Sequence, residues 1–161
     1  MKIAVVYYSY SGKTHQAAEI IVELLQAQGK TVQCLRIEAP QESKNFAIQA
    51  KRALFKQKVA IEPIQSDLSV YDLMILGSPV WAREMVPAVR SYLQSVSGLD
   101  GKKVIIFVTY ASGFGKEHCL RSMEAALEKK GAGQISRFSI SDQRVSHKQS
   151  IETLLNEHLK N

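Results

Sequence analysis

The stretch Lys2-Ile-Ala-Val-Val-Tyr-Tyr-Ser-Tyr-Ser-Gly-Lys-Thr14 is the most informative part of the sequence for the fold class. Residues 2–9 form a nearly continuous β-branched and aromatic run, which is typical of a strand buried on both faces. Residues 10–13 indicate a turn. From Thr14 the apolar residues recur at helical spacing until Gly29, which is suited to end a helix. A buried strand, a tight turn and an amphipathic helix predict the first unit of an α/β sheet.

The rest of the chain repeats this pattern. Further strands are predicted at residues 31–37, 73–76, 103–109 and 135–140. Helices are expected at 44–56, from Pro87, around Leu120–Leu127 and at 151–159. Strands that alternate with helices favour a parallel sheet covered on both faces, which is a three-layer α/β sandwich. A length of 161 residues fits one domain, so we expect residues 1–161 to form it.

Composition narrows the functional classes. No apolar run approaches the ~20 residues that a membrane span needs, and the N-terminus lacks the cleavage site of a signal peptide. We therefore expect a cytoplasmic protein without membrane insertion. Cys34 and Cys119 are far apart and are expected to be ordinary buried thiols. The four histidines show no metal-ligand spacing, so no metal site is predicted.

The charge distribution suggests a partner. The net charge is +6, and basic residues without an intervening acid concentrate between Lys44 and Lys58. They are Lys44, Lys51, Arg52, Lys56 and Lys58. This cluster is either a solvated helix face or a docking patch for an acidic partner. Aromatic residues are not interleaved with it, so no nucleic-acid partner is predicted.

In an open parallel sheet, ligands bind beyond the carboxyl ends of the strands, so the loops there hold the candidate site. The first loop is Ser9-Tyr10-Ser11-Gly12-Lys13-Thr14. It leads into a helix N-terminus, where free N–H groups and the helix dipole attract anions. Three hydroxyls surround a glycine that permits close approach of a ligand, which suits a phosphate monoester. Lys13 either adds charge or is simply exposed.

The Gly-Lys-Thr string in this loop is not a nucleoside-triphosphate loop. That motif requires a glycine five positions before Gly12, and Tyr7 stands there instead. Tyr7 also belongs to the predicted strand, so the loop is too short to wrap a triphosphate.

The other two loops carry aromatic side chains. They are Gly77-Ser78-Pro79-Val80-Trp81-Ala82-Arg83 and Thr109-Tyr110-Ala111-Ser112-Gly113-Phe114-Gly115. Trp81 either stacks on a flat ligand or belongs to the core, and Tyr110 and Phe114 either stack or anchor their loop. A phosphate at one end and a flat ring at the other describe FMN, the simplest ligand of this shape.

The sequence resembles the flavodoxin family. Its first loop matches that family's [ST]-x-[ST]-G-x-T signature, and Tyr71–Trp81 is similar to the family's Y-D-x-[IL]-x-x-G-[ST]-P-x-[WY] segment. The resemblance implies a five-stranded sheet of order 2-1-3-4-5, non-covalent FMN and no catalytic side chain. It implies a cofactor site made of Ser9, Tyr10, Ser11, Gly12, Lys13, Thr14, Ser78, Pro79, Val80, Trp81, Tyr110, Ala111, Ser112, Gly113, Phe114 and Gly115.

Two departures from the family pattern bear on function. Carrier flavodoxins are usually acidic, whereas this chain is basic, so a redox partner protein would present an acidic docking surface. The segment between Ser78 and Glu84 also lacks the glycine that carriers often place beside the flavin, which implies a bias toward two-electron transfer.

Three functions remain open. The favoured one is an FMN-dependent electron carrier. The second is an NAD(P)H-dependent reductase of quinones or FMN, in which Arg83 and the basic cluster could serve the nucleotide phosphate. The third is a flavin-free module that acts through protein contacts, and the intact first loop argues against it.

Overall fold

A single mixed sheet organises the chain, and the computed structural model describes residues 1–160 of it. Five parallel strands lie side by side in the order β2-β1-β3-β5-β6. They are β1 (Lys2–Tyr7), β2 (Thr31–Arg36), β3 (Leu73–Trp81), β5 (Lys103–Tyr110) and β6 (Gln134–Ser141). Counted along the chain, this is the order 2-1-3-4-5, so the predicted parallel sheet is confirmed.

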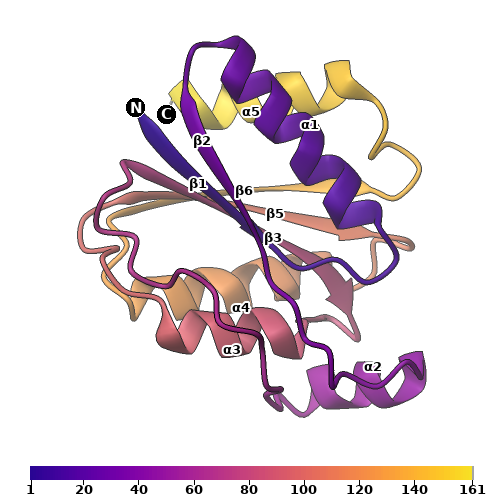
Figure 1. Ribbon diagram of the computed structural model, residues 1–161. Helices are drawn as coiled ribbons and strands as arrows, with labels where there is room; N and C mark the ends of the chain where they lie inside the picture. Colours follow the sequence, from indigo (N-terminus) through magenta and orange to yellow (C-terminus); the bar gives the residue numbers. More distant parts are fainter. Residues whose placement is uncertain (161) are drawn as a thin grey trace.

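The helices form two outer layers (Figure 1). They are α1 (Lys13–Ala27), α2 (Phe46–Leu54), α3 (Pro87–Ser95), α4 (Lys116–Glu128) and α5 (Lys148–Lys160). Helices α1 and α5 cover one face of the sheet, and α3 and α4 cover the other, whereas α2 stands beside the sheet. Pro87 occupies the first turn of α3, as predicted. None of the helices in residues 1–160 is long and apolar enough to cross a membrane.

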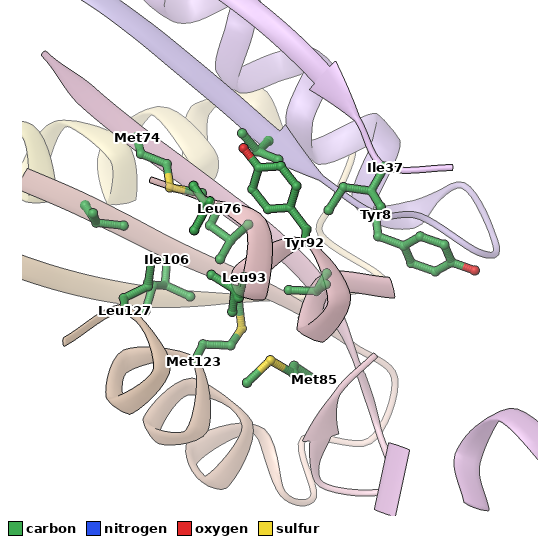
Figure 2. Packing of buried hydrophobic residues seen from close by; sticks show 14 of the residues in the cluster. Tyr8, Ile37, Met74, Leu76, Met85, Tyr92, Leu93, Ile106, Met123 and Leu127 are labelled. Carbon is green, nitrogen blue, oxygen red and sulfur yellow. The ribbon is translucent and has the colours of Figure 1, made fainter. Parts of the chain in front are cut away.

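Each face of the sheet has its own core. Figure 2 shows the cluster beneath α3 and α4, where Met85, Tyr92, Leu93 and Met123 pack toward the strands. The other cluster joins α1 and α5 to the opposite face. On adjacent strands β3 and β5, the ring of Phe107 lies so close to Gly77 that an added Cβ would come within 2.3 Å of it. Only glycine fits at this strand position.

The third strand is longer than predicted. The sequence favoured an end at Leu76 and a loop from Gly77, but β3 continues to Trp81 and turns back into a two-residue strand, β4 (Glu84–Met85). The extension forms because β5 continues alongside it to Thr109. Pro79 is tolerated there because β1 pairs with β3 only as far as Gly77, which leaves one edge of β3 without a β1 partner.

The turn between β3 and β4 carries no glycine. Ala82 and Arg83 occupy it with φ values of 45° and 71°, a left-handed conformation that hairpin turns require and that glycine or asparagine usually supplies. The expected signal for a hairpin was therefore missing. The prediction for Cys34 was also wrong: this thiol is exposed, because β2 is an edge strand, whereas Cys119 is buried as expected.

Candidate functional site

Three segments far apart in the sequence meet at the carboxyl end of the sheet. They surround a cavity of about 230 Å³. The cavity is lined by Tyr10, Ser11, Phe46, Pro79, Val80, Trp81, Thr109, Tyr110, Ala111 and Asp142. Seven of these residues come from the predicted site: Tyr10, Ser11, Pro79, Val80, Trp81, Tyr110 and Ala111. The topology causes this meeting, because β1, β3 and β5 are adjacent and end at the same edge.

The turn after β1 leaves polar groups without partners. The Ser9 hydroxyl is buried, and within residues 1–160 it has no hydrogen-bond partner. Gly12 is the residue before α1 and has a φ of 88°. Because it has no side chain, it cannot cap the helix with a side-chain hydrogen bond. An added Cβ at Gly12 would meet nothing within 4 Å, so the space in front of the helix is open. An unpaired buried hydroxyl beside an open helix N-terminus is suited to an anion.

Two other predicted hydroxyls already have partners. The Thr14 and Thr109 hydroxyls, which come from the first and third segments, are 2.7 Å apart and share a hydrogen bond. Ser78 donates its hydroxyl to the Pro79 carbonyl at 2.9 Å. The Thr14 hydroxyl therefore links α1 to β5 and helps to fix the turn. The Ser78 hydroxyl is instead bonded to the backbone of its own strand.

An aromatic cluster forms one wall of the cavity. The Trp81 ring is 3% exposed and meets the edges of Tyr8, Tyr10 and Phe46 with ring centroids 5.9, 5.4 and 5.9 Å away. Trp81 thus belongs to the core and also lines the cavity. Tyr10 and Phe46 are 43% and 54% exposed, so these two rings form the solvent-facing outer part of the wall.

The third predicted segment divides in two. Tyr110 lines the cavity, and the Lys116 ammonium lies 4.7 Å from the centre of its ring. Phe114 is 73% exposed, and the guanidinium carbon of Arg83 lies 5.4 Å from the centre of its ring. Gly115 packs against Arg83 so closely that an added Cβ would come within 2.6 Å of its backbone. The end of this segment therefore braces the β3–β4 turn.

Three cavity residues lie outside the predicted cofactor site: Thr109, which begins the third predicted loop, and two residues that the sequence did not indicate. Phe46 begins α2, and Asp142 follows β6. Burial raises the pKa of Asp142, and the charge of Lys13 offsets only part of that increase. Neither residue stands in a recognisable motif. The sheet order, which puts the end of β6 beside the end of β5, is the signal that could have found Asp142.

A buried carboxylate lies behind the β3–β4 hairpin. Glu84, 3% exposed, pairs in β4 with Trp81. It accepts hydrogen bonds from Arg90 and Ser122, both at 2.9 Å, and pairs with His118 at 2.8 Å and with Lys56 at 3.8 Å. Burial alone would raise the pKa of Glu84, but the Ser122 and His118 hydrogen bonds and the two cations outweigh it, so the pKa is lowered.

Solved structures share this architecture. Oxidised flavodoxin 2 from Bacillus cereus has a TM-score of 0.68 at 20% identity, with 99% of each chain covered. Two-electron reduced flavodoxin from Megasphaera elsdenii has a TM-score of 0.67 at 21% identity, again with 99% of each chain covered. A flavoprotein from Lactobacillus acidophilus NCFM, solved in complex with FMN, has a TM-score of 0.60 at 18% identity, covering 92% of this chain and 98% of that one.

The sequence itself gives the family. No curated protein matches it. The family model described as Flavodoxin matches residues 2–149, which is nearly the whole chain and spans all three segments around the cavity. The chain therefore belongs to the flavodoxin family.

Proposed function

We propose that this protein binds FMN non-covalently and acts as an electron carrier. The observation that carries the proposal is the buried Ser9 hydroxyl, which has no hydrogen-bond partner among residues 1–160 and lies beside the open N-terminus of α1. Burying a hydroxyl without a hydrogen bond is costly, and a phosphate oxygen at this position would satisfy it. The FMN in the Lactobacillus relative and the flavodoxin family membership support the same ligand.

Different segments of the site contact different parts of the ligand. The turn of residues 9–14 holds the phosphate with the Ser9 and Ser11 hydroxyls and the first N–H groups of α1. Residues 78–81 and 110–113 flank the flat ring, with Trp81 and Tyr110 as its aromatic neighbours. When bound, FMN supplies the redox chemistry, and the protein controls its access to solvent and its electrostatic surroundings.

The cavity must widen to admit the ring. Its volume of about 230 Å³ is below the ~300–1,000 Å³ of sites that enclose ligands of this size. Tyr10 and Phe46 are about half exposed, so they lose little packing when they rotate outward. We expect ligand binding to displace these two rings and to leave the buried Trp81 in place.

A second candidate function rests on Arg83. Its guanidinium lies on the Phe114 ring, at the tip of the hairpin that carries Trp81. A cation at this place could hold the phosphate of NAD(P)H, which would make the protein an NAD(P)H-dependent reductase of quinones or FMN. The same residue also braces the turn through Gly115, and this contact accounts for its position without a nucleotide.

Visible spectroscopy tests the proposal directly. The purified protein, with and without added FMN, should show one equivalent of bound flavin after removal of free ligand. A protein that stays colourless after FMN is added would contradict it and would favour the flavin-free module. Steady-state oxidation of NAD(P)H with a quinone acceptor then separates carrier from enzyme, because a carrier alone should show no turnover.

A further inference from the structure

A second, larger cavity lies away from the candidate flavin site. It is a groove of about 890 Å³ between α3 and α4, closed at one side by the chain that follows α2. Its apolar lining consists of Met85, Leu93, Ala125 and Ala126, of which Met85 and Leu93 are buried and the two alanines reach the surface. Its rim is formed by Lys56, Lys58, Arg90, Gln94, His118, Arg121, Ser122, Lys129 and Lys130. We call these thirteen residues the α3–α4 groove.

Basic residues are concentrated in the groove. Six of its thirteen residues are lysine or arginine, and none is acidic. The chain has 21 basic and 15 acidic residues, so the fifteen basic residues outside the groove equal the acids in number. The groove thus holds as many basic residues as the chain has in excess of acids, and the buried Glu84 beside it neutralises part of that charge through Lys56 and Arg90.

Part of this charge has no partner within the protein. Lys58, Arg121 and Lys129 are exposed, and within residues 1–160 none of them forms an ion pair or a side-chain hydrogen bond. Glu84 is buried beneath the rim and fixes Arg90 with its carboxylate at 2.9 Å. One acid thus anchors part of the rim, while Lys58, Arg121 and Lys129 stay available to a partner. Like charges held together repel one another, and an external anion relieves that repulsion.

The shape of the rim excludes a small anion as the best occupant. His118, Arg121, Ser122 and Ala125 follow one face of α4, and Lys129 caps its C-terminus on the same side of the groove. From residue 118 to residue 129 this face rises by about 16 Å at ~1.5 Å per residue. A single phosphate touches only a few ångströms of such a face. The groove is complementary to an elongated ligand with several negative charges and an apolar side.

We propose that the α3–α4 groove docks an acidic amphipathic helix of a partner protein. Apolar side chains of the helix lie on Ala125, Ala126 and the aliphatic stems of the rim lysines and arginines, and flanking carboxylates meet Lys58, Arg121 and Lys129. A nucleic acid is also an elongated polyanion, but the groove holds no aromatic side chain for base stacking and has an apolar lining. The proposal concerns a different surface from the flavin site and does not depend on flavin binding.

A fluorescent helical peptide provides the test. The probe is about 18 residues long, with leucine at helical spacing and glutamate on both flanks, and its binding is followed by fluorescence polarisation. The double variant Arg121→Glu/Lys129→Glu should weaken binding at least tenfold. The matched control Lys30→Glu/Lys160→Glu changes the net charge equally on residues outside the groove and should stay within about twofold of the unmodified protein.

Further measurements locate the peptide and identify rival occupants. Amide chemical shifts should change along α3 and α4 when the peptide is added, and both double variants should still bind FMN like the parent protein. Failure of the peptide to bind, or equal weakening by both double variants, would overturn the proposal. Tighter binding of an oligothymidylate of similar length would assign the groove to nucleic acid. A concentration-dependent dimer that Arg121→Glu/Lys129→Glu abolishes would assign it to a second copy of the chain.

Discussion

Ser9 and Glu84 are both polar and nearly buried, 7% and 3% exposed, yet their surroundings differ completely. Ser9 ends the first segment of the candidate site with a hydroxyl that has no partner in residues 1–160. Glu84, at the back of the β3–β4 hairpin, has four partners: Lys56, Arg90, His118 and Ser122. A buried polar group that is fully hydrogen-bonded within the protein stabilises the fold. A buried polar group without a partner at an open helix N-terminus is positioned to bind a ligand.

The open helix end is essential to this distinction. Ser136, inside β6, also has a buried hydroxyl without a partner in residues 1–160. It pairs with Ile105 of β5, within the edge strand β6 and not at a strand-to-helix turn. The unmade hydrogen bond of Ser136 therefore lowers folding stability without forming an anion site. This makes Ser136 a suitable control for Ser9.

The largest expected effect is on stability at Glu84. Replacing Glu84 with alanine leaves the Arg90 guanidinium beside an empty buried space and should lower the free energy of unfolding by about 3–5 kcal/mol. Urea unfolding measures it. Glu23→Ala is the matched control, because the Glu23–Lys148 pair is 64% and 51% exposed and should contribute about 0–1 kcal/mol. Similar losses for the two variants would remove the contrast between Glu84 and an ordinary surface pair.

A smaller effect, on binding and not on folding, is expected at Ser9. Ser9→Ala removes one hydrogen bond to a charged phosphate, worth about 1.5–3 kcal/mol, so FMN should bind about 10–150 times more weakly. Urea unfolding without FMN should show no loss of stability, since the hydroxyl has no partner to lose. Ser136→Ala should leave FMN affinity unchanged. Equal affinity in the Ser9→Ala and unmodified proteins would contradict the role given to Ser9.

The weakest effect that we expect is a pH dependence of the folding stability that Glu84 contributes. The pKa of Glu84 lies below its ordinary value of 4.5, so the folded state favours the ionised carboxylate. Its stabilisation is fully present above that ordinary value and is lost as the pH falls through the lowered pKa. The stability gap between the unmodified protein and Glu84→Gln should therefore narrow as the pH falls below the ordinary value of 4.5. A gap that stays constant as the pH falls would show that Glu84 acts through shape alone.

The fold could be predicted because its signals are local. Each buried strand is a short apolar run, Gly29 follows α1 with a φ of 73°, and Pro87 opens α3. The parallel sheet follows from their alternation. The β3–β4 hairpin was not predictable in this way, because Ala82 and Arg83 carry no turn signal and adopt their φ values only in the finished fold.

The candidate site was predictable where one segment forms one surface. Tyr10, Ser11 and the residues 79–81 line the cavity, since they directly follow or end adjacent strands. Phe114 turned instead toward Arg83, and Phe46 came from a helix that no motif connects with the sheet edge. The partners of Glu84 lie up to 38 residues away, so only the packing of α3 and α4 brings them together.

The concentration of charge in the α3–α4 groove has a consequence for how the molecule approaches others. A body whose positive charge is concentrated along one side has a permanent dipole moment, and it rotates in the field of an acidic surface before contact is made. Encounters with such surfaces will therefore occur with α3 and α4 leading. The hairpin that joins Glu84 to Trp81 then arrives at the encounter together with them, and added salt will slow this pre-orientation by shortening the reach of the field.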